Sequence, residues 1–178
     1  MVEELEKIAP VHVSDIYTIE DTIVLMKQYG VLFSVQEKVT EITIQLTKLV
    51  SDFKAYVKGK KPIKVAYFIW RNPWMVSGNN TIIHHLLELN KFENVFGDIS
   101  RYPEVTLEML AMSHKPEVVF LSSEPYPFKE KHITELQKVL TDTNIILVDG
   151  EYFSWYGTRL LGAFTYFKDL HDKLSAKN

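Results

Sequence analysis

The chain has 178 residues, of which 46% are hydrophobic and 24% charged, as is typical of a globular protein with one sizeable core or two small ones. Its formal net charge is -3 and its lysines are scattered among acidic residues, so it has no basic stripe for phosphates and is not expected to bind nucleic acid. Because it holds no cysteine, disulfides, thiolate catalysis and cysteine-ligated metals are excluded, while the redox compartment stays open.

The N-terminal segment is predicted to hold a short helix, a lone strand over Val11–Val13 and a second helix. Thr18 and Asp21 have the spacing of a weak capping box at the start of that second helix, and Gly30 is expected to end it. An isolated strand leaves its backbone groups unpaired. We therefore expect either a missing sheet or a second copy of the chain to receive it.

The first ten residues also bear on the compartment. They carry three glutamates and lack the cationic start and apolar stretch of an export signal, and no later run is long enough to span a membrane. The chain as given is expected to be cytoplasmic, or to be a mature or truncated fragment of an exported protein.

A long amphipathic helix is predicted from Val35 to Val57. Its apolar residues recur at alternating steps of four and three positions, which draws one stripe along a helix. The stripe consists of Val35, Val39, Ile42, Leu46, Leu49, Phe53 and Tyr56.

After residue 62 the pattern changes to short β-rich runs separated by segments with helical spacing. The runs Ile63–Trp70, Glu117–Leu121 and Asn144–Val148 are almost uniformly apolar, which indicates strands covered on both faces. The alternation predicts an α/β fold with a parallel, helix-flanked sheet. A final helix is expected to bury the stripe Leu160, Phe164, Phe167, His171 and Leu174.

Ligands of open parallel sheets bind beyond the carboxyl ends of the strands, and each strong strand here is followed by a loop rich in aromatic and charged residues. We interpret these loops as one side of a site for a large, partly apolar ligand. The candidate ligand-binding residues are Trp70, Arg71, Trp74, Arg101, Tyr102, Glu124, Tyr126, Phe128, Glu151, Phe153 and Trp155. The two arginines suit either an anion clamp or a surface ion pair.

Catalysis is the less favoured interpretation of the same loops. Glu124, Asp149 and Glu151 could act as paired acid and base, but the sequence holds no nucleophile, metal or phosphate-loop motif. No catalytic residue is therefore assigned. The enzyme alternative is a small α/β hydrolase that uses Glu124 and Glu151.

The histidines predict no metal site. His84 and His85 are adjacent and diverge on a helix, so one is expected to be packed and the other solvated. His132 is left open between a ligand contact and an ordinary surface residue.

Several motifs in this order resemble a known family, the helical-backbone (class III) substrate-binding proteins of cobalamin, haem and ferric-siderophore ABC transporters. They are 67–75 (YFIWRNPWM), 79–83 (NNTII), 94–96 (NVF), 101–108 (RYPEVTLE), 121–128 (LSSEPYPF) and 148–157 (VDGEYFSWYG). That family has two Rossmann-like lobes joined by one long helix. The resemblance implies that residues 1–33 are the remnant of a first lobe, 34–58 the joining helix and 63–178 the Rossmann-like second lobe.

The resemblance further implies capture of a metal chelate, namely cobalamin, haem or a ferric siderophore, for import, without enzymatic chemistry or a resident cofactor. The expected partner is the transporter permease, onto which Glu108 would dock, with Glu104 as its competitor. The implied location is the periplasm or cell envelope. The remaining alternative is a self-sufficient cytoplasmic homodimer in which the N-terminal segment is exchanged between copies.

Overall fold

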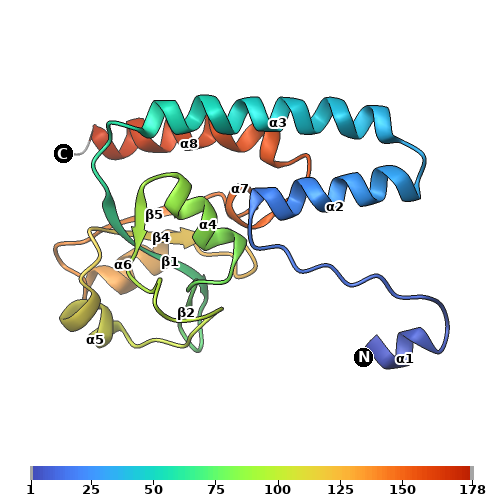
Figure 1. Ribbon diagram of the computed structural model, residues 1–178. Coiled ribbons are helices and arrows are strands. Elements are labelled where there is room, and N and C mark those ends of the chain that lie inside the picture. Colours follow the sequence, from blue (N-terminus) through green and yellow to red (C-terminus); the bar gives the residue numbers. More distant parts are fainter. Residues whose placement is uncertain (1, 177–178) are drawn as a thin grey trace.

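The computed structural model describes residues 2–176. Its N-terminal part consists of α1 (Val2–Glu6), an extended segment and α2 (Ile19–Leu32). Figure 1 shows α1 standing apart from the other elements, with the extended segment leading back to α2. None of the residues of α1 is buried.

The strand predicted at Val11–Val13 is wrong. These residues are extended but belong to no strand. A strand needs a neighbour to pair its N–H and C=O groups, and the five-stranded sheet of this chain does not include the segment.

Helix α2 begins as predicted but ends later. The Thr18 hydroxyl accepts a hydrogen bond from the Asp21 N–H, and the Asp21 carboxylate accepts one from the Thr18 N–H, which completes the capping box. Gly30 does not end the helix, which continues to Leu32. Instead it allows close packing, because a Cβ at Gly30 would lie 3.1 Å from Cγ2 of Val39 in the next helix.

The predicted long helix is confirmed as α3 (Gln36–Val57), and the last helix is α8 (Leu160–Ser175). The two lie side by side along the top of the molecule in Figure 1. They meet through an aromatic cluster in which the Phe53 ring lies 5.5 Å from Phe164 and 5.9 Å from Phe167. All five residues of the predicted stripe on the last helix are buried.

The sheet has the order β2-β1-β4-β5, with β3 also paired to β1. Its main strands are β1 (Ile63–Trp70), β4 (Val118–Ser122) and β5 (Asn144–Val148), and they run parallel. The predicted second strand is thus shifted by one residue. Short β3 (Phe92–Asn94) is parallel to β1, whereas β2 (Met75–Val76) is antiparallel to it. The predicted α/β class is confirmed.

Helices cover both faces of this sheet. Alternate residues of β1, such as Val65 and Tyr67, face a core shared with α3, α8 and α4 (Ile82–Leu89), and this core also buries Phe153 of the short α7 (Glu151–Ser154). The other residues of β1, such as Ala66 and Phe68, face a second core. That core is closed by α5 (Leu107–Met109), the one-turn π-helix η1 (Leu110–His114) and α6 (Glu130–Gln137). No helix within residues 2–176 is both long and apolar enough to cross a membrane.

Candidate functional site

The carboxyl ends of three parallel strands bring the predicted loops to one edge of the sheet. Trp70 ends β1, Ser122 ends β4 and Val148 ends β5. The loops are held together by short polar contacts: the Ser123 N–H donates to the Val148 carbonyl over 3.0 Å, and the Gly150 N–H donates to the Ser123 hydroxyl over 2.9 Å. The loops after β4 and β5 are therefore fixed to one another.

Four ring side chains lie on this edge, and we call Trp70, Tyr126, Trp155 and Tyr156 the aromatic rim. Trp70 and Trp155 are 39% and 52% exposed. The ring of Trp70 meets that of Tyr126 edge-on, with 5.6 Å between centroids. The Trp155 indole N–H donates to the Glu124 carboxylate over 2.8 Å, which links the loops after β4 and β5. Trp70 and Trp155, which are exposed and held by these contacts, are suited to contact a bulky ligand.

Three other predicted ring residues are turned inward. Phe128 and Phe153 are buried in the two cores, so they have no surface to offer a ligand and their assignment is corrected to core packing. Trp74 is partly buried and stacks parallel on Phe128, with 6.2 Å between ring centroids. It packs beneath its loop instead of standing on the edge.

The arginines near this edge are already paired with carboxylates. Arg71 donates two hydrogen bonds to Glu135, of 3.1 and 2.8 Å. These bonds lower the pKa of the Glu135 carboxyl and raise that of the guanidinium. Arg101 donates to Asp15 over 3.1 Å. Both arginines therefore form ion pairs in this structure, as one of the two interpretations of the sequence held.

The carboxylates proposed for catalysis are held by other partners. Glu151 forms an ion pair of 2.6 Å with Arg159, which also lies 3.6 Å from Asp149. The Glu124 side chain accepts from Trp155. Within residues 2–176, neither glutamate side chain is hydrogen-bonded to a nucleophile or to a second acid or base. This geometry gives no support to the hydrolase alternative.

The burial of the three histidines differs from what the sequence predicted. His84 and His85 are both partly buried, and they diverge as expected, because His84 contacts Asn94 whereas His85 lies near Glu20. His132 is buried and is not a surface residue. Its Nδ1 accepts a hydrogen bond of 2.9 Å from the Lys129 N–H at the start of α6. No group of three potential metal ligands gathers among the described residues.

The remaining predicted residues lie on the surface beside β2. Tyr102 is 39% exposed, and burial of part of its ring raises the pKa of its hydroxyl. Glu104 is exposed and its backbone bridges to Met75. Glu108 is exposed in the first turn of α5. Both glutamate side chains are thus accessible to solvent.

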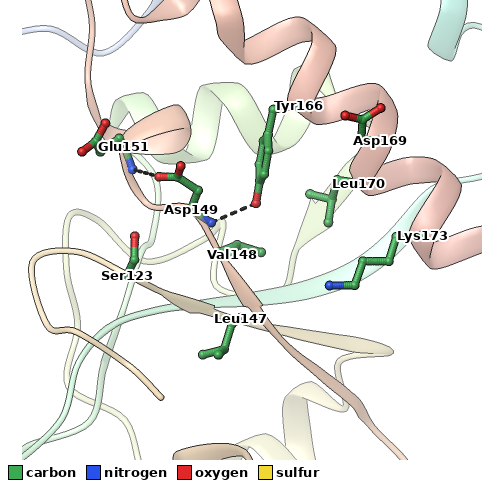
Figure 2. Close-up of a pocket in the computed structure, with 9 residues that line it drawn as sticks. All are labelled: Ser123, Leu147, Val148, Asp149, Glu151, Tyr166, Asp169, Leu170 and Lys173. Atoms are coloured by element: carbon green, nitrogen blue, oxygen red, sulfur yellow. Dashed lines mark hydrogen bonds between the residues drawn. The ribbon is translucent and has the colours of Figure 1, made fainter. Parts of the chain in front are cut away.

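A pocket of about 610 Å³ lies beside β5 (Figure 2). Its wall on α8 includes Tyr166, whose hydroxyl accepts a hydrogen bond of 2.9 Å from the Asp149 N–H. The pocket reaches the strand ends at Ser123 and Glu151, but no member of the aromatic rim lines it. It opens on the flank of the sheet, so we do not assign the large ligand to it.

Gly150 lets the loops after β4 and β5 come together. A Cβ at this position would lie 2.3 Å from the Ser122 Oγ and 2.9 Å from the Glu124 backbone nitrogen. The variant Gly150→Ala is therefore expected to lose about 1–3 kcal/mol of stability through overpacking, and to displace Glu124 from Trp155. Denaturant unfolding measures the first effect and tryptophan fluorescence the second.

The matched control is Gly59→Ala, because a Cβ there would meet nothing within 4 Å. Its stability should be unchanged or should rise by up to about 1 kcal/mol. Equal stabilities for the two variants would show that the loops do not depend on this close approach.

Sequence reasoning missed several residues of this edge. Tyr156 was detectable, because it follows Trp155 directly. The partners Asp15, Glu135 and Arg159 left no local signal, since their contacts at the edge join residues that lie 8 to 86 positions apart.

Comparison with solved structures identifies the architecture. A possible iron-binding (periplasmic solute-binding) protein from Staphylococcus epidermidis superposes with a TM-score of 0.78 at 22% identity, over 97% of this chain and 69% of that one. An ABC-type Fe³⁺-hydroxamate transport system from Saccharomonospora viridis gives 0.70 at 21%, over 95% and 64%. The fold is that of a periplasmic solute-binding protein. The vitamin B12-binding protein BtuF of Vibrio cholerae also shares this solute-binding-protein fold, with 0.69 at 17%, over 93% and 68%.

These superpositions establish the fold, as the resemblance of the motifs had led us to expect. Neither a protein-family model nor a curated protein sequence matches the chain. The chain spans roughly two thirds of the length of each of these three proteins, so a substantial part of each has no counterpart here.

Proposed function

We propose that this chain is part of an ABC-transporter substrate-binding protein that captures a large metal chelate, such as cobalamin, haem or a ferric siderophore, and does not transform it. The observation that carries the proposal is the aromatic rim, which stands at the carboxyl edge of a rigid parallel sheet. Flat, partly apolar ligands are recognised by such exposed rings. By the same resemblance, the protein works in the periplasm or cell envelope.

The first lobe is expected to complete the site. Val24, Val31, Leu32 and Phe33, which we call the apolar α2 face, are each more than half exposed. Large exposed apolar residues grouped on one helix and its end indicate a surface that packs against another protein body. We propose that residues 1–33 belong to a first lobe, that 34–58 join the lobes, and that 63–178 form the second lobe, although Met1, Lys177 and Asn178 lie outside the described residues.

Contact with the permease is assigned to the exposed surface before η1. Glu108, with Glu104 as its competitor, would form ion pairs with arginines of the permease. Both carboxylates lack an ion-pair partner among residues 2–176, so docking would break no existing pair.

Binding is tested by isothermal titration calorimetry with haem, cyanocobalamin and a ferric hydroxamate. At least one should bind, and Trp155→Ala should weaken that binding by about tenfold or more, as expected for an aromatic anchor. Phe33→Ala is the control, since Phe33 is also an exposed ring but lies on the apolar α2 face. Failure of all three chelates to bind would reject the proposed function for this chain.

Light scattering on the same samples examines the homodimer alternative. Exchange of residues 1–33 between copies would give a dimer. The variant Phe33→Asp should dissociate that dimer, because it places a charge in the apolar interface. A monomer with the apolar α2 face exposed would reject exchange.

A further inference from the structure

The charged groups around the aromatic rim indicate which net charge of ligand this edge favours, which the fold alone does not. An anionic chelate, such as haem with its propionates or a ferric catecholate, is normally met by free arginines or lysines. Arg71 directly follows β1, Arg159 contacts Glu151 after β5, and Arg101 donates to the Asn80 carbonyl in the loop that follows β2. Whether these arginines are free therefore bears on which ligand charge the edge favours.

Each of the three guanidinium groups is already matched by a carboxylate. Arg71 is held by two hydrogen bonds to Glu135. Arg101 is held by Asp15 at 3.1 Å. Arg159 lies 2.6 Å from Glu151 and 3.6 Å from Asp149. An anion that recruited any of these arginines would have to break an existing pair and leave a carboxylate nearby without its partner.

Glu124 is the contrasting group. Its carboxylate accepts one hydrogen bond, from the Trp155 indole N–H, over 2.8 Å. It has no lysine or arginine within 4.0 Å anywhere in residues 2–176. A carboxylate can accept several hydrogen bonds, so Glu124 retains capacity for a donor from outside the chain. The side chain is half-buried, which weakens the screening of its charge by water and salt.

The rings beside Glu124 favour the same kind of ligand. Trp155 is bonded to the Glu124 carboxylate, and Tyr126 follows two residues later in the same loop and packs against Trp70. Aromatic faces attract cations through their quadrupole, and tryptophan does so most strongly. The unpaired carboxylate and the exposed ring faces thus act on the same side of the molecule.

We propose that the aromatic rim takes a positively charged metal chelate, with a cationic amine of the ligand directed to Glu124, in preference to an anionic one. This second proposal rests on the binding function proposed above and adds the charge class of the ligand. A ferric trihydroxamate that carries a free protonated amine has this chemistry: the chelate centre is neutral and the positive charge is on the amine.

The test compares two ligands that differ only in that amine. Ferrioxamine B carries a protonated amine, whereas its N-acetylated derivative is neutral and has the same iron centre. Equilibrium dialysis, followed through the absorbance of the iron complex, gives the dissociation constant of each with the unmodified chain. We expect the amine form to bind about tenfold more tightly or better, as for a close charge pair at an interface, and the ratio to fall as salt is added.

Glu124→Gln keeps the shape of the side chain and can still accept the Trp155 N–H, but it removes the negative charge. The ratio of the two dissociation constants should fall to about one, because the amine that distinguishes the two ligands no longer meets a negative charge. Glu41→Gln is the matched control, because it removes one negative charge from the exposed surface of α3. The preference should persist in that variant.

The outcomes separate the two levels of the proposal. Equal binding of both forms, or a preference that survives Glu124→Gln, overturns the assignment of charge class. Tight binding of haem or a ferric catecholate without binding of ferrioxamine B overturns it as well, but leaves the binding function standing. If neither these chelates nor cyanocobalamin binds the chain, the proposed function itself fails.

Discussion

The variant Phe53→Ala is expected to lose about 3–5 kcal/mol of stability, the range for deletion of a buried phenylalanine ring. Phe53 is fully buried between α3 and α8, where its ring meets those of Phe164, Phe167 and His171. Removing it leaves a cavity at the contact between the long helix and the sheet domain. Urea unfolding followed by circular dichroism measures the change.

Ile44→Ala is the control for this prediction, because Ile44 is on the same helix but is 66% exposed. Its stability should change by no more than about 0.5 kcal/mol. A similar loss in both variants would contradict the prediction that α3 is stabilised by docking onto α8.

Stability is expected to fall in mild acid because of His171. Burial lowers the pKa of this imidazole to about 4, while a hydrogen bond with the Asn90 backbone opposes the shift. Its ring stacks on Phe92 at 4.8 Å, and its Nε2 has no partner among the described residues. Protonation would therefore place a positive charge in an aromatic core.

The direction of the pH dependence follows from the two pKa values. An unfolded histidine titrates near 6.5, so between pH 6.5 and 4 the unfolded chain binds more protons than the folded one. The contribution of His171 is complete above pH 6.5 and is lost as the pH falls toward 4, by up to about 3 kcal/mol. Urea unfolding at pH 7, 6, 5 and 4 measures the slope.

His171→Phe provides the comparison, since it keeps a ring in the core and removes the titrating group. Burial also lowers the pKa values of His85 and His132, so the variant should keep part of the acid loss. The difference in slope between the two proteins is the contribution of His171. Identical slopes would contradict the prediction.

The order of helices and strands in this chain follows from local patterns. The boundaries of β1 and β5 agree with their apolar runs, and the stripe on the last helix is buried as predicted. Such patterns are informative because strands covered on both faces need uniformly apolar residues and an amphipathic helix needs a period near 3.6. The strand predicted at Val11–Val13 was wrong because a strand depends on a distant pairing partner. The helix end predicted at Gly30 was wrong because this glycine allows close packing between helices.

Around the proposed site, the sequence located the loops but not the direction of their side chains. It nominated Trp74, Phe128 and Phe153 together with Trp70 and Trp155, because all are rings that follow strands. The structure buries the phenylalanines, packs Trp74 beneath its loop and leaves the other tryptophans exposed. Whether a ring faces solvent depends on what packs beneath the loop, which is contributed by other elements.

The amino-acid sequence alone thus determined the α/β class, the long helix and the edge of the sheet at which the aromatic loops gather, because periodicity and strand direction are local properties. Only the tertiary structure decided which arginines are neutralised and that Glu124 is not. Those pairings join residues up to 86 positions apart, and the distance between two charges is set when the chain folds.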